Sequence, residues 1–224
     1  EDILAFMSKV SDGTKQSTKK LRFTLLAAFF NYIKNSVDPD FQNPCVNPAL
    51  RKLFRAGKPT PFKIIEKDVI DEIIFRTSNP RNRLILELMA RACMRVGEVL
   101  KLTPKDIEDR KAIIREPKSG KEAEVAFLPQ KVADRLKKYI SDNGIEPGAR
   151  IFPITYAAAR IIVKKAGYPV GILLKPHEFR RHAATYDSRS GTPIEIVSKI
   201  LLRHSSLSIT QIYLGKISDA EAIR

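Results

Sequence analysis

Two basic side chains in the segment KPHEFRRHAATY are of the types, and at the spacing, that can bind a phosphate group. Pro176 favours the first turn of a helix, so His177 and Arg180, three residues apart, are expected on one face near a helix N-terminus. Helix N-termini favour anions, and a guanidinium group can make two parallel hydrogen bonds to phosphate oxygens. The segment therefore predicts a phosphate-binding site. The alternative interpretation is a capped helix with a solvated basic face.

A second arginine lies in MRVGEVLKL, where Arg95 stands among apolar residues and Glu98 follows at position i+3. The carboxylate of Glu98 either neutralises Arg95 in a structural ion pair or holds its guanidinium group toward the phosphate of a ligand. Downstream, the turn PKSGK presents Lys118 and Lys121 between two expected strands, although a plain turn is the alternative.

A histidine and a tyrosine close this set in the segment LLRHSSLSITQIYLG. His204 and Tyr213 are nine residues apart, which is roughly 13 Å along a straight helix. They can meet at one site only if the chain bends between them, and the serines that follow His204 permit a bend. The alternatives are a buried structural histidine and a tyrosine at the edge of the core.

Hydrophobic periodicity and turn residues predict a mainly helical chain with one small antiparallel sheet, that is, an α+β fold. The sheet is expected between residues 106 and 128, around the turns EDRK and KSGK. An amphipathic helix is expected over residues 19–34, with an apolar face that includes Leu21, Leu25, Phe29 and Tyr32. The other expected helices span residues 49–56, 66–76, 81–94, 132–142, 156–166, 176–189 and 193–202, and the helix over 81–94 is expected to begin through Asn79 and Pro80.

A basic, proline-rich segment that ends at Pro61 predicts a semi-rigid linker between two domains. We expect a small helical domain over residues 1–57, a linker over 58–61 and a larger domain over 62–224. A helical domain of the first size is marginal by itself, so further helices of that domain are expected upstream.

The composition points to a folded protein that binds polyanions. The 224 residues include 40 Lys plus Arg against 25 Asp plus Glu, a formal net charge of +15. Nucleic acid, an anionic membrane and an acidic partner all fit this charge. No apolar run is long enough for a membrane span and no secretory leader opens the chain, so a soluble, cytoplasmic protein is expected. Cys45 and Cys93 fit neither a disulfide framework nor a metal-ligand spacing, so a reducing compartment and no bound metal are expected.

Taken in chain order, these motifs resemble the tyrosine recombinase family, also called the phage integrase family, over residues 64–215. MRVGEVLKL is similar to the family's first-arginine box, the Lys118 turn to its β-hairpin lysine, and HEFRRH to its His-x-x-Arg box. LRHSSLSITQIY is similar to the family's His-to-Tyr box and is the most specific of the four. The resemblance implies a partial helical core-binding domain followed by a tyrosine-recombinase catalytic domain.

The implied activity is site-specific breakage and rejoining of DNA without a metal or cofactor. Tyr213 would attack the scissile phosphodiester and form a 3′-phosphotyrosyl bond. A phenol has a pKa near 10, so it needs a base or an orienting group, a role that falls to His177. Lys118 would donate a proton to the departing 5′-oxygen. Lys121 competes for that role, and Lys118 is preferred because it directly precedes the Ser-Gly turn, as in the family.

The remaining members of the implied site stabilise charge. Arg95 and Arg180 would bind the non-bridging oxygens in the transition state, and His204 would donate a further hydrogen bond. Glu98 would not contact the phosphate but would hold the side chain of Arg95 in position.

The chain departs from the family pattern at two places. Ala92 and Cys93 stand where members often carry Thr-Gly, and Arg203 stands where a glycine commonly precedes the histidine. Arg203 either adds a phosphate contact or is only tolerated at its position. His182 is expected to be structural.

The resemblance implies double-stranded DNA as the partner, bound by four protomers on two paired sites, and accessory DNA-bending proteins can join them. It also implies a place at the nucleoid. Two alternatives stay open: a catalytically silent DNA-binding protein of the same fold, and a type IB topoisomerase that relaxes DNA.

Overall fold

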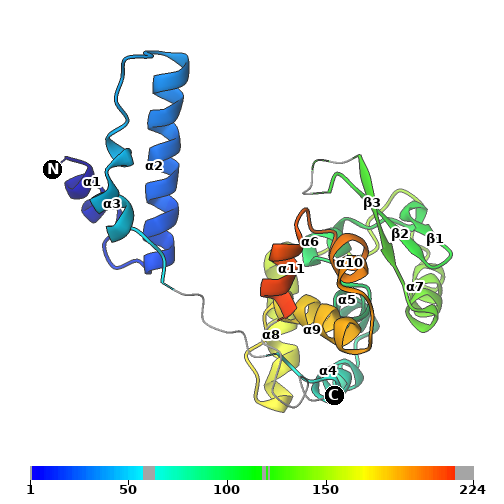
Figure 1. Cartoon of the computed structure of the whole chain (residues 1–224). Helices are drawn as coiled ribbons and strands as arrows, with labels where there is room; N and C mark the ends of the chain where they lie inside the picture. The colour runs from blue at the N-terminus through cyan, green and yellow to red at the C-terminus, as the bar shows by residue number, and fades with distance from the viewer. Residues whose placement is uncertain (1, 58–63, 118–119, 121, 215–224) are drawn as a thin grey trace. The chain divides into compact units, whose positions relative to one another are not determined.

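The computed structural model describes residues 2–57, 64–117, 120 and 122–214, and the chain divides into two compact units, Glu1–Pro61 and Phe62–Arg224 (Figure 1). Both are mainly helical, and the second also contains one three-stranded antiparallel sheet, which confirms the predicted fold class. Over the described ranges, none of the helices combines the length and the apolar character needed to cross a membrane.

The first unit is built around one long helix, α2, with the shorter helices beside it (Figure 1). Its core joins Met7, Phe23, Cys45 and Phe54, and the rings of Phe23 and Phe54 stack with their centroids 4.8 Å apart. The elements are α1 (Asp2–Ser11), α2 (Gln16–Ser36), the 3-10 turn η1 (Pro44–Val46) and α3 (Pro48–Leu53).

Helix α2 is present as predicted, but its predicted apolar face is not the buried one. The core covers the face that carries Phe23, whereas the predicted residues are 56–62% exposed: Leu21, Leu25, Phe29 and Tyr32. Apolar residues occur on more than one side of this helix, and periodicity alone does not say which side tertiary contacts will cover.

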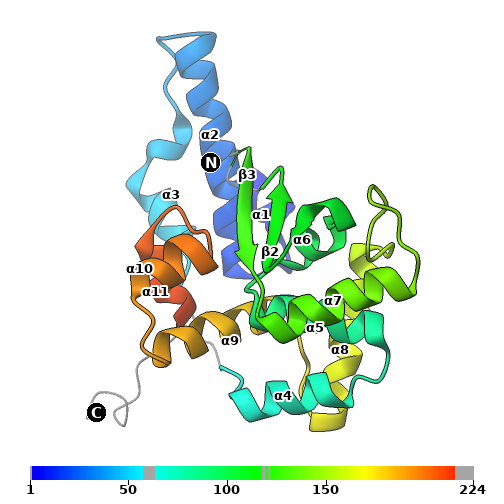
Figure 2. The same cartoon turned by 90° about the vertical axis from the view of Figure 1, so that its right-hand side faces the viewer.

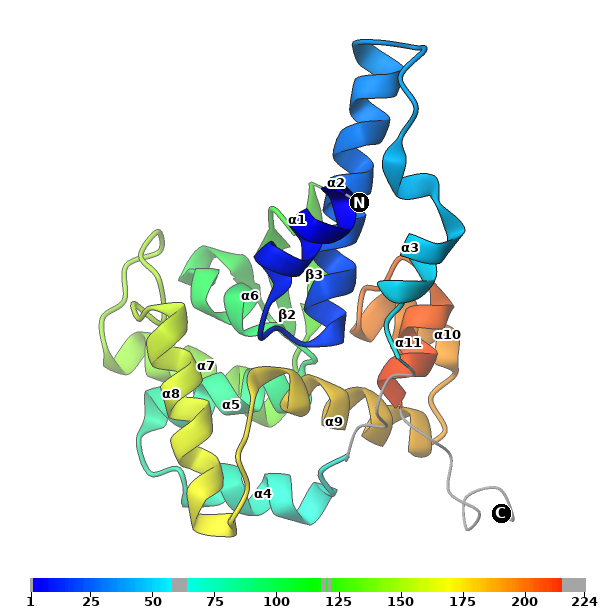
Figure 3. The same cartoon turned by 90° about the vertical axis from the view of Figure 1, so that its left-hand side faces the viewer.

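The second unit is organised around α5, whose residues 84–90 are all buried. Figure 2 shows α7 and α9 flanking this helix, and Figure 3 shows α4 beside α8. Asn79 begins α5 as the sequence predicted, because its side chain accepts a hydrogen bond of 3.0 Å from the Asn82 N–H and Pro80 occupies the first turn. The helices are α4 (Lys67–Arg76), α5 (Pro80–Arg91), α6 (Val96–Lys101), α7 (Gln130–Asp142), α8 (Tyr156–Gly167), α9 (Pro176–Arg189), α10 (Ile194–Ile196) and α11 (Leu207–Leu214), with 3-10 turns η2 (Pro104–Asp106) and η3 (Tyr168–Val170) and a π-helical turn η4 (Val197–Leu201).

The sheet has the order β1 (Ile107–Glu108), β2 (Lys111–Arg115), β3 (Ala123–Phe127), with both pairs antiparallel. Side chains alternate along β2 and β3, so that Ala112, Ile114 and Ala126 are buried in the core. The sheet therefore lies where it was predicted. Lys118 and Lys121, in the connection between β2 and β3, lie outside the described residues.

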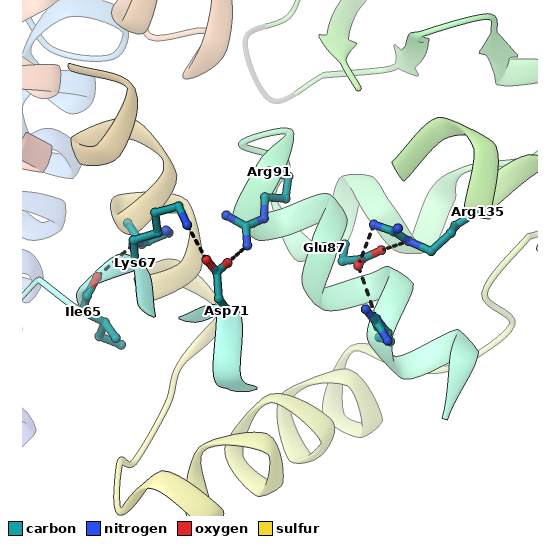
Figure 4. A network of polar contacts seen from close by, with 8 residues as sticks. Ile65, Lys67, Asp71, Glu87, Arg91 and Arg135 are labelled. Carbon is teal, nitrogen blue, oxygen red and sulfur yellow. Dashed lines mark hydrogen bonds and ion pairs between the residues drawn. The ribbon is translucent and has the colours of Figure 1, made fainter. Parts of the chain in front are cut away.

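Charged groups tie the helices of the second unit together (Figure 4). The buried carboxylate of Glu87 on α5 accepts two hydrogen bonds from Arg135 on α7, at 3.0 and 2.9 Å. Asp71 on α4 pairs with Lys67 at 2.6 Å and with Arg91 at the end of α5. A buried carboxylate such as that of Glu87 is stable only when it is paired, so its contact with Arg135 helps to fix α5 against α7, and the contact between Asp71 and Arg91 joins α4 to the end of α5.

His182 has a structural environment, as expected. Its Nδ1 lies 2.8 Å from the carbonyl oxygen of Ile65, and its ring stacks on Tyr186 with centroids 6.1 Å apart. The contact joins α9 to the segment that precedes α4.

Three predicted helices end differently in the structure. The helix expected over residues 49–56 ends at Leu53. The helix expected over residues 81–94 ends at Arg91, because Cys93 has the left-handed backbone angle φ = 50°. The helix expected over residues 193–202 is divided into α10 and η4, and non-helical geometry follows from Leu202 to Ser206. The chain therefore bends between His204 and Tyr213, as their meeting at one site requires.

Candidate active site

Arg180 is the structural centre of the candidate site. It lies in the second turn of α9 and is only 1% exposed. Its Nη1 donates to the carbonyl oxygen of Cys93 and its Nη2 to that of Leu202, so one guanidinium group joins the turn before Arg95 to the turn before His204. Burial, and then the nearby Arg95 and Arg203, lower the pKa of Arg180 to about 10, which leaves it protonated at neutral pH.

The two turns that Arg180 joins have the same backbone conformation. Cys93 has φ = 50° and Arg203 has φ = 53°, in the left-handed region that non-glycine residues enter at a cost of about 1–2 kcal/mol. These are the two departures from the family's glycines, and the geometry explains why glycine suits both positions. In this chain, non-glycine residues adopt the positive φ at both positions.

Arg95 is held in place by Glu98. It immediately precedes α6, where its backbone N–H donates to Glu98 Oε2 at 2.8 Å and its Nη1 donates to Oε1 at 2.6 Å. Burial alone would raise the pKa of Glu98, but Arg203 and the hydrogen bonds from Arg95 outweigh burial and lower it. Glu98 is therefore an anion that fixes Arg95, while the arginine side chain stays 27% exposed.

His204 is a neutral member of the cluster. Burial, followed by the charges of Arg180, Arg95 and Arg203, lowers its pKa to about 4. Its Nδ1 lies 3.0 Å from Thr210 Oγ1, which in turn lies 2.9 Å from Ser198 Oγ, and both hydroxyls are fully buried. This chain of hydrogen bonds orients the imidazole ring and ties it to α11 and η4.

An open cavity of about 800 Å³ lies beside this cluster, and Arg95, Glu98, His177 and Arg180 contribute to its lining, whereas His204 does not. His177 is exposed in the first turn of α9. Further cations line the same cavity, among them Lys105 and Arg150. Among the described residues, six Lys and Arg side chains line the cavity against three Asp and Glu side chains, and this excess of positive charge suits a polyanion.

Two predicted site residues are less fully described. Tyr213 belongs to α11, which packs against α9 and η4, while its side chain lies outside what the structure describes. Lys118 lies outside the described residues. Among the described side chains, no group of three or more His, Cys, Asp or Glu could hold a metal ion.

Comparison with known protein families identifies the chain. Residues 63–218 match the phage integrase family, and this match covers most of the 224 residues. The chain belongs to the phage integrase family. Its members are the tyrosine recombinases, enzymes that break and rejoin DNA, so this recombinase carries out site-specific recombination. DNA relaxation and silent DNA binding are not favoured by these findings.

Curated relatives and solved structures agree with this assignment. The recombinase is 27% identical over 229 residues to a tyrosine recombinase of Pseudothermotoga lettingae, covering 98% of this chain and 77% of that protein. It is 30% identical over 223 residues to tyrosine recombinase XerA of Pyrococcus horikoshii, covering 95% of this chain and 74% of the relative. The crystal structure of XerH site-specific recombinase, bound to its palindromic difH substrate after cleavage, has the same fold, with a TM-score of 0.76, 21% identity, and coverage of 98% of this chain and 67% of that one.

The sequence did not indicate several residues that shape the site of this recombinase. Ser198 and Thr210 support His204 through hydroxyl groups that look unremarkable in sequence, although Thr210 stands three residues before Tyr213 and so shares its helical face. Arg150 lines the cavity from a loop without any motif. The burial of Arg203 was also not foreseen.

Acidification is expected to destabilise the recombinase partly through His204. The pKa of this group is about 4 in the folded state against an ordinary value of 6.5. Between these values the unfolded chain binds a proton that the folded chain does not, so the free energy of unfolding falls as the pH falls through this window. Each unit of pKa difference corresponds to about 1.4 kcal/mol, so the complete loss, below both pKa values, is on the order of 3–4 kcal/mol.

Denaturant unfolding of the wild type and of His204→Asn, between about pH 7 and about pH 4.5, measures this contribution. The variant should lose less stability on acidification than the wild type. Burial also lowers the pKa of His182, which acts in the same direction but is present in both proteins. Equal pH dependence of the two proteins would contradict the assignment.

Proposed function

We propose that this recombinase cleaves and rejoins duplex DNA through a covalent bond between Tyr213 and a 3′-phosphate. The observation that carries the proposal is the environment of Arg180. Two backbone carbonyls hold its guanidinium group in the interior, beside Arg95 and next to a basic cavity. A guanidinium group that is protonated at neutral pH and held in a fixed, buried position can stabilise the negative charge that develops on a phosphodiester during displacement.

The proposed cleavage is an in-line displacement. Tyr213 Oη bonds to phosphorus while its proton passes to His177, and the bond between phosphorus and the 5′-oxygen breaks. The departing oxygen takes a proton from Lys118 and becomes a 5′-hydroxyl. Because the phosphotyrosyl bond replaces one phosphate ester with another, the reverse reaction rejoins a strand without an external energy source.

The other site residues act on the non-bridging oxygens. Arg95 and Arg180 supply positive charge there, and Glu98 keeps Arg95 oriented through two hydrogen bonds. His204 is neutral at neutral pH, so it contributes a hydrogen bond rather than a charge. Its contact with Thr210 places that hydrogen bond in a fixed direction.

The DNA partner follows from the same proposal. The net charge of +15 supplies a sequence-independent attraction to phosphates, with the first unit acting as a core-binding domain and the second as the catalytic domain. We further propose that four protomers act on two paired sites, assisted by accessory DNA-bending proteins, and that the recombinase works at the nucleoid.

A nicked suicide substrate tests the proposal. Cleavage beside the nick releases a short fragment, so rejoining fails and the covalent complex accumulates on a denaturing gel. Protease digestion and mass spectrometry should then place the DNA on the peptide that contains Tyr213. Tight binding with no covalent product on any duplex selected from genomic fragments would contradict the proposal.

The affinity for DNA is expected to fall steeply with salt concentration, because bound Lys and Arg side chains displace counterions. Arg150 lines the cavity from an exposed loop, and replacing it with Ala should reduce the slope of log affinity against log salt by about 1.

Lys138→Ala provides the matched control, since this side chain is 75% exposed, pairs with Asp142 at 3.1 Å and does not line the cavity. Fluorescence anisotropy over a salt series measures both slopes. A slope that Arg150→Ala leaves unchanged would remove Arg150 from the DNA-binding surface.

A further inference from the structure

Arg203 is a buried cation whose role neither the sequence nor the proposed reaction explains. It directly precedes His204, yet its side chain is only 4% exposed. Unlike Arg180, Arg203 does not line the cavity, and its guanidinium group faces two carboxylates and a backbone carbonyl, so it is not placed to bind DNA phosphates. The structure also does not merely accommodate Arg203, because its guanidinium group contacts Glu98, Glu124 and the carbonyl oxygen of Leu201.

These contacts join two buried carboxylates. Arg203 Nη2 lies 2.6 Å from Glu98 Oε2, and its Nε lies 3.2 Å from Glu124 Oε2 on β3. Its Nη1 donates to the carbonyl oxygen of Leu201 at 3.0 Å. The side chains of Glu98 and Glu124 are only 9% and 6% exposed, so both depend on a nearby cation.

The two oxygens of Glu98 have different charged partners. Oε1 accepts from Arg95 Nη1 at 2.6 Å, whereas Oε2 pairs with Arg203 and accepts from the Arg95 backbone. If Arg203 were absent, Arg95 would be the remaining charged partner of both Glu98 oxygens. The Glu98 carboxylate would then neutralise more of the positive charge of Arg95. The ion pair between Arg203 and Glu124, which connects the turn before His204 to β3, would also be lost.

We propose that Arg203 is a positioning residue for DNA cleavage, which acts by holding Glu98 in the orientation that presents Arg95 and by fastening β3 to the turn that carries His204. The inference rests on the proposed function, since it concerns the same reaction. It replaces both roles considered from the sequence, a phosphate contact and simple tolerance. Arg203 touches no reacting atom and works through the carboxylates.

A double-mutant cycle with Glu98 tests this role, with Arg203→Gly as the first variant because glycine accepts the left-handed backbone at this position. The readout is the single-turnover rate of covalent complex formation on the suicide substrate. We expect Arg203→Gly to lower the rate by about 10- to 100-fold in the wild-type background, as for a misplaced catalytic group. In the Glu98→Gln background the same change should lower the rate by a clearly smaller factor, because the part of the effect that passes through Glu98 is already lost and only the part through Glu124 remains.

The slope of DNA affinity against salt separates this role from a phosphate contact. We expect the slope to be unchanged in Arg203→Gly, whereas loss of a phosphate contact would reduce it by about 1. A reduced slope, or an equal loss of rate in both backgrounds, would overturn the inference.

The double variant Arg203→Gly/Glu124→Gln separates positioning from loss of folding. It removes the buried carboxylate that Arg203→Gly leaves unpaired, so its thermal stability should recover while its cleavage rate stays low. A rate that recovers together with stability would show a merely structural role and would overturn the inference. Wild-type protein that forms no covalent complex would overturn the proposed function and this inference together, whereas a cleaving wild type with no coupling would overturn the inference alone.

Discussion

Replacing Tyr213 with Phe is expected to abolish covalent complex formation while DNA binding stays within about 2-fold of the wild type. The change removes a single oxygen atom, and that atom is the proposed nucleophile. Loss of a nucleophile typically lowers a rate by about 10⁴-fold or more, so the phosphotyrosyl product should fall below detection. A suicide-substrate assay on a denaturing gel, beside an anisotropy titration, measures both quantities.

Tyr156 provides a matched control for this experiment. It opens α8, lines the same cavity and is 53% exposed, so Tyr156→Phe makes the same chemical change within the candidate DNA-binding surface. This variant should form the covalent complex at close to the wild-type rate. A complex that survives in Tyr213→Phe and disappears in Tyr156→Phe would transfer the nucleophile to Tyr156.

Replacing Arg180 with Lys should have the second largest effect, even though the charge is kept. The guanidinium group donates to the carbonyl oxygens of Cys93 and Leu202 at once, and a lysine ammonium group cannot reproduce this planar geometry. We expect the cleavage rate to fall by about 10²- to 10³-fold, the range found when one transition-state donor is lost. We also expect the free energy of unfolding to fall by about 2–4 kcal/mol, because hydrogen bonds from charged groups are worth about 1.5–3 kcal/mol each.

Arg160→Lys is the control for the second experiment, since Arg160 is exposed on α8 and does not line the cavity. It should change neither the single-turnover rate nor the denaturation midpoint measurably. If Arg180→Lys were equally silent, the two carbonyl contacts would not organise the site.

The fold could be predicted wherever local sequence carries the physical signal. The start of α5 was found because Asn79 and Pro80 form a cap by themselves, and the sheet was found because β-forming residues alternate around turns. The end of α5 was not predicted, because nothing in the local sequence indicates that Cys93 adopts a left-handed backbone conformation. The exposed face of α2 was missed for a related reason, since burial depends on which other helices pack against it.

The candidate site could be predicted in its residue types but not in its connections. The motifs indicated Arg95, His177, Arg180 and His204, and the structure places three of these around one cavity, with His204 electrostatically coupled to Arg180. The roles of these residues and of Tyr213 and Lys118 remain predictions for the experiments above. The neutrality of His204 could not be predicted, because it results from burial beside three arginines from separate parts of the chain.

The family and the α+β fold class could be predicted from local sequence, because both depend on residue types at short and regular spacings. The same spacings predict which side chains are available for phosphodiester chemistry, but what these side chains contact depends on how the chain folds. The hydrogen bond from Arg180 to Cys93 spans 87 residues and the ion pair between Arg203 and Glu98 spans 105, so neither leaves a trace in local periodicity. Burial then sets the energies, since it lowers the pKa of His204 and makes the buried carboxylates depend on Arg203.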